Sequence, residues 1–258
     1  MFGLRGAYLA LAVAAACLMS AGHALAAIGD DPLQSPQWTD LKDRYLGMAQ
    51  VVFDPRVVVS GPKVAEDSMN VPVGIRITGL SGVRRVLVIA DLNPIVKVLE
   101  FSSKGALPSL HFRMKLQQGS PVRAMAQTAD GVWHVGGIWI DASGGGCTAP
   151  SVGRSSANWT ETLGQVQSRV WQGETQSRVK LSIMHPMDTG LAPGIPAFYI
   201  ERLSLQDAAG KEWMTLDTFE PVSENPVFSF DFAGPPPAGL KLVGRDNNGN
   251  RISAKVAQ

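Results

Sequence analysis

Residues 121–141, PVRAMAQTADGVWHVGGIWID, contain the pattern that decides the fold. Two runs rich in β-branched and aromatic residues, 121–128 and 132–141, flank the dipeptide Asp130-Gly131. This dipeptide favours the tight turn of a β-hairpin, because its residues tolerate the positive φ angles that such a turn requires. The stretch therefore predicts two antiparallel strands joined by a short turn.

Similar runs continue on both sides of this hairpin. Upstream runs cover residues 56–60, 71–77, 83–91, 96–101 and 109–116, and downstream runs cover 177–184, 197–206, 212–219, 227–232, 239–246 and 251–256. The turns between them are too short to hold crossover helices, so parallel βαβ units are not expected. The pattern predicts an all-β chain with two immunoglobulin-like β-sandwich domains.

A short N-terminal helix is expected over residues 36–49. Apolar residues at helical spacing define its buried face: Trp38, Leu41, Tyr45 and Met48. Ser35 and Pro36 suit the N-cap and the first helical position. The simplest interpretation is a helix that packs on a sheet.

Residues 1–26 are expected to be a cleaved secretory signal peptide. Arg5 precedes an apolar run, and Ala24-Leu25-Ala26 forms a small-x-small cleavage site. The run is shorter than a membrane span requires. The alternative is a lipoprotein anchor on Cys17, but the leucine expected three positions before such a cysteine is missing. We therefore expect export without a membrane anchor.

The exported chain divides into three parts. Residues 27–141 are expected to form the first sandwich, residues 142–172 a Gly-rich cysteine arm and linker, and residues 173–258 the second sandwich. The small polar composition of the middle part is typical of a flexible linker, with a short helix over residues 159–171 as an option at its end. Asn158 begins an N-glycosylation triplet whose use the sequence leaves open.

Cys147 is the most informative residue, because Cys17 would leave with the signal peptide. A lone thiol in an exported protein has no internal disulfide partner, so it is buried, paired with another molecule, or reactive. Gly144, Gly145 and Gly146 precede it and predict a mobile arm with an accessible thiol. Neither Lys nor His occurs within five residues of it, so activation is expected to come from a protein that receives the arm.

Composition argues against several other functions. The formal net charge is +1 and charged residues make up 17% of the chain, so there is no basic excess for nucleic-acid binding. The sequence has no metal-ligand spacing, phosphate-binding or dinucleotide-binding glycine motif, or haem-attachment motif. We therefore expect neither a cofactor nor a metal.

Several motifs resemble one known family. In the second block, residues 185–190, HPMDTG, are similar to a string in SoxZ, the smaller subunit of the sulfur-oxidation carrier. In the first block, residues 70–73, NVPV, residues 91–94, DLNP, and the Gly-Gly-Cys arm resemble SoxY. The chain thus resembles a single-chain SoxYZ-like carrier, similar to the fused forms associated with quinoprotein (PQQ-dependent) alcohol dehydrogenases.

The resemblance implies a non-enzymatic periplasmic carrier. Cys147 would hold a thiosulfate-derived sulfur-oxidation intermediate covalently, on a swinging arm formed by Gly144, Gly145 and Gly146. Its partners would be a c-type cytochrome, a sulfate-releasing hydrolase, and a sulfane dehydrogenase or a quinoprotein dehydrogenase system. The SoxZ-like domain would supply a structural loop, with no membrane or nucleic-acid partner. The residues of that loop are His185, Pro186, Met187, Thr189 and Gly190.

Two departures and two alternatives remain. The arm leads into the second domain instead of ending the chain, and Thr148-Ala149-Pro150 follows the cysteine where the family has glycines. One alternative is an accessory binding module of a quinoprotein dehydrogenase without covalent cargo. The other is a secreted interaction protein that uses Cys147 for an intermolecular disulfide.

Overall fold

The computed structural model describes residues 31–152 and 158–256, and the expected signal peptide, residues 1–26, lies outside the described residues. The first half comprises α1 (Trp38–Leu46), β1 (Val51–Phe53), β2 (Val57–Ser60), β3 (Val64–Ala65), β4 (Val71–Ile77), β5 (Val83–Ala90), β6 (Lys97–Ser103), β7 (Ser109–Met114), β8 (Ser120–Thr128) and β9 (Trp133–Ala142). The second half comprises α2 (Trp159–Thr162), β10 (Val166–Gln172), β11 (Gln176–Ile183), β12 (Ile200–Gln206), β13 (Glu212–Thr218), β14 (Val227–Ala233), β15 (Lys241–Asp246) and β16 (Arg251–Lys255).

The hairpin predicted from residues 121–141 is present as β8 and β9. The two strands pair antiparallel, and the amide of Thr128 donates to the carbonyl of Val132 at 3.0 Å. Gly131 has a φ of 87°, the left-handed conformation that this turn demands and that glycine adopts without strain. The local turn chemistry therefore closes the hairpin as predicted.

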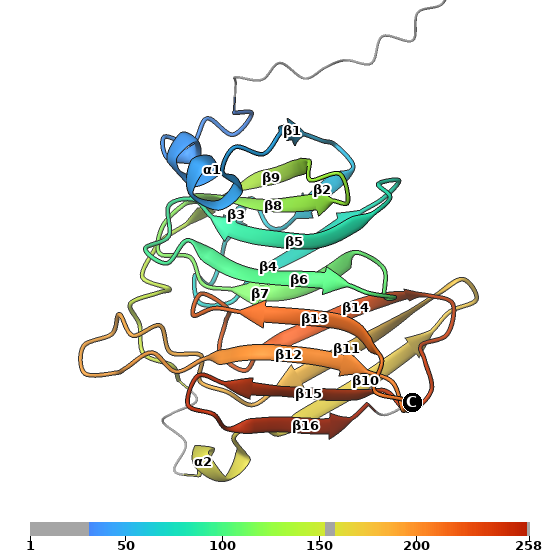
Figure 1. Ribbon diagram of the computed structural model, residues 1–258. Coiled ribbons are helices and arrows are strands. Elements are labelled where there is room, and N and C mark those ends of the chain that lie inside the picture. Colours follow the sequence, from blue (N-terminus) through green and yellow to red (C-terminus); the bar gives the residue numbers. More distant parts are fainter. Residues whose placement is uncertain (1–30, 153–157, 257–258) are drawn as a thin grey trace, which may run out of the picture.

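Each half is a β-sandwich, and the two sandwiches join edge to edge (Figure 1). One sheet of ten strands has the order β1-β9-β8-β5-β6-β13-β12-β15-β16, with β3 beside β9, and the other has the order β10-β11-β14-β7-β4-β2. The halves meet where β6 pairs with β13 and β7 pairs with β14, both antiparallel. The expected immunoglobulin-like sandwiches are thus confirmed, and backbone hydrogen bonds between their edge strands join them.

The hydrophobic core is also continuous across the junction. One buried cluster runs from Val57 in β2 to Val256 beyond β16, and it includes residues from both sheets of both halves. Phe101 of β6 and Leu216 of β13 face each other in register and are each 1% exposed. Separating the halves would expose this apolar surface as well as two open sheet edges.

The helix expected near the N-terminus is present, but its ends and its face differ from the prediction. Trp38 and Leu41 are buried as expected, whereas Met48 lies beyond α1 and is fully exposed. Ser35 is not the N-cap; its carbonyl accepts the amide of Trp38 at 3.2 Å instead, and Gln37 precedes the helix. In the described part of the chain, no helix is long and apolar enough to cross a membrane.

Three strands were not predicted, and the reason differs among them. β1 and β3 are very short, and each pairs in parallel with β9. They form because of this pairing with a strand far away in the chain, and their own residues show no strand pattern long enough to be recognised. β10 lies in the segment expected to be a linker, where the optional helix over residues 159–171 is wrong beyond Thr162. As an edge strand with half-buried and exposed residues, β10 has too little apolar content to be recognised.

The edge-to-edge junction makes a testable prediction. If the chain is cut at a protease site introduced within residues 153–157, the two halves should still elute together in gel filtration. The β6–β13 and β7–β14 pairs and the shared core hold them without the covalent link. Electrophoresis in denaturant would verify that the cut is complete. Elution as two separate halves would show that the junction is not a stable interface.

Candidate functional site

Cys147 is buried, contrary to the accessible thiol expected from its glycine arm. Its relative exposure is 0%, and its thiol donates to the carbonyl oxygen of Lys115 at an Sγ···O distance of 3.9 Å. Among the described residues it is the one cysteine, and it is unpaired. The sequence could not show this burial, because the groove that covers the thiol is made by residues far away in the chain.

The glycine arm is packed against the loop that follows β7. Gly145 and Gly146 donate their amides to the carbonyls of Gln117 and Leu116 at 3.2 and 3.1 Å. A Cβ on Gly146 would lie 2.1 Å from the carbonyl oxygen of Ser68 and 2.6 Å from that of Leu116, so only glycine fits there. In this arrangement the glycines allow close approach of two backbones, and they do not leave the arm free.

Gln117 holds the segment around the thiol. Its side-chain oxygen accepts the amide of Cys147 at 3.1 Å and the hydroxyl of Thr148 at 3.4 Å. Gln117 is itself positioned by Asn93, whose side chain accepts the amide of Gln117 and donates to the carbonyl of Lys115, both at 2.9 Å. Asn93 belongs to the DLNP string, so this motif builds the groove that receives the arm.

The second sandwich closes the other side of the groove. The hydroxyl of Thr189 donates to the carbonyl oxygen of Cys147 at 2.5 Å. Two residues of the exit segment also bond to this half: Ser151 donates its amide to Asp188 at 3.3 Å and Val152 donates to Glu224 at 2.6 Å. The HPMDTG loop therefore contacts the cysteine segment directly.

Lys115 provides a positive charge near Cys147, although no Lys or His lies close to the cysteine in the sequence. It is 2% exposed, and its ammonium donates to the carbonyl of Met187 and, at 3.3 Å, to that of Glu220. A residue of the first sandwich thereby satisfies two carbonyls of the second. No local pattern indicates this role, because Lys115 lies at the end of an apolar strand run and is distant in sequence from both the cysteine and the HPMDTG loop.

The electrostatics of the site keep the thiol protonated. Burial raises the pKa of the Cys147 thiol from 9.0 to about 11, and the charge of Lys115 lowers it only in part. Burial also lowers the pKa of Lys115 from 10.5 to about 8, against the raising effect of the acidic groups around it, Cys147 first. At neutral pH the thiol of Cys147 is therefore neutral, and the ammonium of Lys115 beside it is mostly charged. A neutral thiol is a weak nucleophile, so Cys147 is poorly reactive in this conformation.

His185 has the structural surroundings expected of it. Its Nδ1 accepts the amide of Met187 at 3.1 Å, and its ring contacts that of Phe198 with centroids 4.4 Å apart. Its backbone exchanges hydrogen bonds with Asn225, at 3.2 Å to the side chain and 2.8 Å from the amide. Nε2 lies 3.5 Å from a carboxylate oxygen of Asp246. His185 thus ties the HPMDTG loop to the segments around Asn225 and Asp246.

The other loop residues divide between packing and turn formation. Met187 is buried with a φ of 52°, and Gly190 has a φ of 78° beside Ala197. Pro186 is also buried.

Within residues 31–152 and 158–256, there is no group of three His, Cys, Asp or Glu side chains that could hold a metal ion.

Comparisons with known proteins agree with the motifs. Residues 42–147 match the family described as sulfur oxidation protein SoxY, and residues 157–257 match the family described as sulphur oxidation protein SoxZ. No curated protein matches the chain. A similar solved structure is the sulfur carrier protein SoxY from Chlorobium limicola f thiosulfatophilum, with 15% identity and a TM-score of 0.36, over 42% of this chain and 96% of that chain.

The packing of Gly146 predicts how fast Cys147 reacts. The wild-type thiol should react slowly with a thiol reagent until the protein is denatured, and Gly146→Ala should react faster. Its methyl group cannot fit beside Ser68 and Leu116. Overpacking costs about 1–3 kcal/mol, so the released population should rise roughly 10- to 100-fold.

Gly145→Ala is the matched control. A methyl group at Gly145 would meet no atom within 4 Å, so this substitution causes no overpacking. It would destabilise the protein only through the strain of an alanine at a φ of 83°. It should accelerate labelling less than Gly146→Ala. Rapid labelling of the wild type, at the rate of the denatured chain, would contradict the buried site.

The buried lysine predicts a specific pH dependence. Lys115 has a pKa of about 8 in the folded protein and an ordinary value of 10.5. Between these values the unfolded chain binds more protons, so Lys115 makes the free energy of unfolding rise with pH across this window. Cys147 acts in the opposite direction from pH 9 to about 11, because the folded protein keeps a proton that the unfolded thiol loses.

Urea denaturation should therefore be compared in a Cys147→Ser background, with and without Lys115→Met. From about pH 8 to about pH 10, the free energy of unfolding should rise in the protein that keeps Lys115, relative to the Lys115→Met protein. Parallel pH profiles would show that Lys115 is not a buried, destabilised cation.

Proposed function

We propose that this chain, which belongs to the SoxY and SoxZ families as a fusion of one domain of each, is a carrier that holds a thiosulfate-derived sulfur group covalently on Cys147. The family assignment places the chain in sulfur oxidation. The covalent cargo, the periplasmic location and the partner enzymes are the proposal. The chain itself would be a carrier without catalysis.

The position of Cys147 is the observation that supports this role best. It is the last residue of the SoxY match, follows three glycines, and is the one cysteine of the described chain. Contacts from both domains converge on its segment, through Gln117 on one side and Thr189 on the other. A structural cysteine would need no such segment, because any small apolar side chain could fill its place.

The proposed loading step is an oxidation. The Sγ of Cys147 forms a bond to the sulfane sulfur of thiosulfate, the thiol proton leaves to solvent, and two electrons pass to an acceptor. A c-type cytochrome partner would accept those electrons. A hydrolase partner would then add water to the terminal sulfonate sulfur and release sulfate, which leaves a persulfide on Cys147. A sulfane dehydrogenase or a quinoprotein dehydrogenase system would continue from the persulfide.

Burial sets a condition on this chemistry. The thiolate is the nucleophile, and a pKa of about 11 leaves little thiolate at neutral pH. The arm must therefore leave the groove before loading, which breaks its hydrogen bonds to Gln117 and Thr189. Because Gly144 and Gly145 have φ values of 103° and 83° and meet few side chains, they are suited to rotate during this release. The described conformation is then the protected state of the carrier.

The test is the mass of the adduct on protein purified from its native compartment, before and after reduction. Wild type should carry a reducible mass on Cys147, and Cys147→Ser and Cys147→Ala should carry none. Since the residue is buried, these substitutions should also lower stability, by about 1 kcal/mol. Thermal denaturation of both variants would separate loss of cargo from loss of fold.

His185→Ala tests the division of roles between the domains. Loss of the Nδ1 acceptor leaves the buried amide of Met187 unpaired, which should cost about 1–3 kcal/mol. The adduct should still form, because the imidazole supports a loop and does not touch the thiol. A stable His185→Ala protein without adduct would assign the second domain a part in the chemistry. Wild type without adduct in its native compartment would favour an accessory module without covalent cargo.

A further inference from the structure

The outer face of the six-stranded sheet carries an excess of positive charge. Strand register places five cations on this face: Arg76 on β4, Arg113 on β7, Arg178 and Lys180 on β11, and Arg169 on β10. All five are exposed. The single carboxylate at an outward position of these strands is Asp231, which pairs with Arg178 at 2.7 Å. We call these five cations the cationic face.

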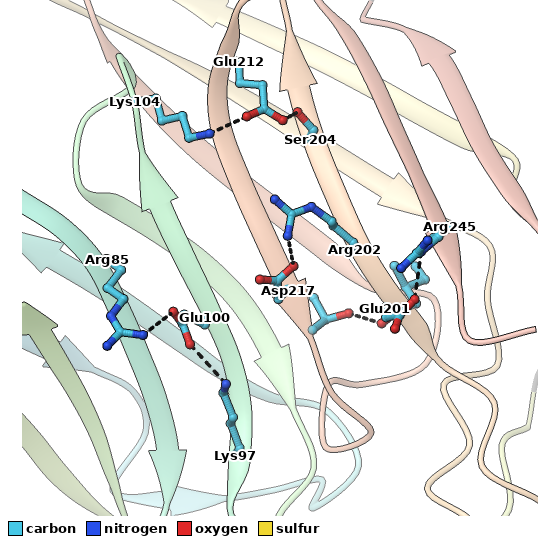
Figure 2. A network of polar contacts seen from close by, with 12 residues as sticks. Arg85, Lys97, Glu100, Lys104, Glu201, Arg202, Ser204, Glu212, Asp217 and Arg245 are labelled. Carbon is cyan, nitrogen blue, oxygen red and sulfur yellow. Dashed lines mark hydrogen bonds and ion pairs between the residues drawn. The ribbon is translucent and has the colours of Figure 1, made fainter. Parts of the chain in front are cut away.

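The opposite face of the molecule serves as an internal comparison. On the ten-stranded sheet, neighbouring strands pair their charges, as Figure 2 shows. Arg85 and Lys97 both contact Glu100, at 3.3 and 3.1 Å. The other pairs are Arg202 with Asp217 at 2.9 Å, Arg245 with Glu201 at 2.8 Å, and Lys104 with Glu212. Several cations of that sheet thus pair with a carboxylate on a neighbouring strand, whereas Lys97 and Glu100 both lie on β6.

Among the described residues, four members of the cationic face have no carboxylate within ion-pair distance. Within residues 31–152 and 158–256, Arg178 is the member that has a carboxylate within ion-pair distance. Arg169 instead lies over the ring of Trp171, 4.9 Å from its centroid, and Trp171 is 41% exposed. Arginine and tryptophan are the residue types enriched in protein interfaces, and unpaired like charges repel unless a partner neutralises them.

The cationic face is also hollowed. A cavity of about 920 Å³ crosses the junction of the two domains, and Arg113, Arg178 and Lys180 contribute to its lining. A second hollow of about 400 Å³ adjoins it at Trp171 and Lys180 and extends to Arg169. Strands from both sandwiches therefore line one concave surface.

We propose that the cationic face is the docking surface for an acidic surface of a partner protein. Its cations lie on four of the five adjacent strands from β4 to β10, a stretch that spans about 19 Å at the usual strand spacing. One small oxyanion cannot neutralise charges so far apart, whereas a row of carboxylates on a protein can. The face ends near the cysteine site, because Arg113 lies two residues before Lys115, whose carbonyl contacts the thiol.

The location gives docking a consequence for the carrier. A partner seated on this face would lie beside the end of β7, and the arm packs against the loop that follows that strand. Complementary charge would speed encounter and orient the partner, with an effect that falls as salt concentration rises. The inference rests on the proposed function only in taking the partner to be one of the proteins that the carrier visits.

The experiment uses a short labelled peptide of alternating glutamate and aspartate as the probe. Affinity for the full exported chain is measured by fluorescence anisotropy at several salt concentrations, and the indole signal of Trp171, assigned with Trp171→Phe, is followed by NMR. The triple variant Arg113→Gln, Arg169→Gln, Lys180→Gln should bind about tenfold more weakly. The wild-type Trp171 signal should shift on binding.

The matched control removes the same charge elsewhere. Lys241→Gln, Arg251→Gln, Lys255→Gln lies on β15 and β16 of the other sheet and should leave affinity within about twofold of wild type. Cys147→Ser should bind the peptide like wild type, so loss of cargo and loss of docking are separate outcomes.

Three results would overturn the proposal. Equal weakening in the two triple variants would show only a general charge effect. If the NMR signal of Trp171 does not shift when the peptide binds, the peptide binds at another surface. Competition by sulfate or by a single-stranded oligonucleotide that matches or exceeds the peptide would assign the face to a small anion or to nucleic acid.

Discussion

The pairing of β6 with β13 and of β7 with β14 is the constraint on which the rest of the structure depends. An exposed sheet edge leaves backbone donors and acceptors open and invites aggregation. Here each sandwich covers two edges of the other (Figure 1). One buried cluster extends through both sandwiches. The chain is therefore two domains by origin and a single packed unit in its physical behaviour.

The cysteine site is a product of that junction. Lys115 reaches from the first sandwich to carbonyls of Met187 and Glu220 in the second. Thr189 reaches back to the carbonyl of Cys147, and Gln117 holds the amide of the same residue. Because groups from both halves hold the arm, a change in the junction would change the exposure of the thiol. The burial of Cys147 thus depends on how the two domains meet.

Charge is distributed unequally over the two outer faces, although the chain is close to neutral. On the ten-stranded sheet, Arg85, Arg202 and Arg245 each pair with a carboxylate on a neighbouring strand (Figure 2). On the six-stranded sheet, four of the five outward-facing cations have no carboxylate within ion-pair distance among the described residues. Arg113 of this set lies close to Lys115, which directly follows β7. A nearly neutral chain can still carry a local surface whose charge suits one acidic partner.

Local sequence determined much of this protein, because strands, turns and motifs are encoded by neighbouring residues. The hairpin around Gly131, the two sandwiches and the family relationship all follow from periodicity, turn residues and short strings. The cysteine and the three glycines before it are equally plain in the sequence. Strands as short as β1 and β3, which exist through long-range pairing, could not be found in this way.

Only the tertiary structure decided the state of the thiol. Three adjacent glycines, considered alone, indicate a flexible backbone. In the structure, however, Gly146 is required because its backbone packs so closely against the carbonyls of Ser68 and Leu116 that no side chain would fit. The burial of Cys147, the cation of Lys115 and the contact from Thr189 come from segments far apart in the chain. Burial and electrostatic environment are properties of what surrounds a residue in space, and for Cys147 those surroundings arise only when the two sandwiches join.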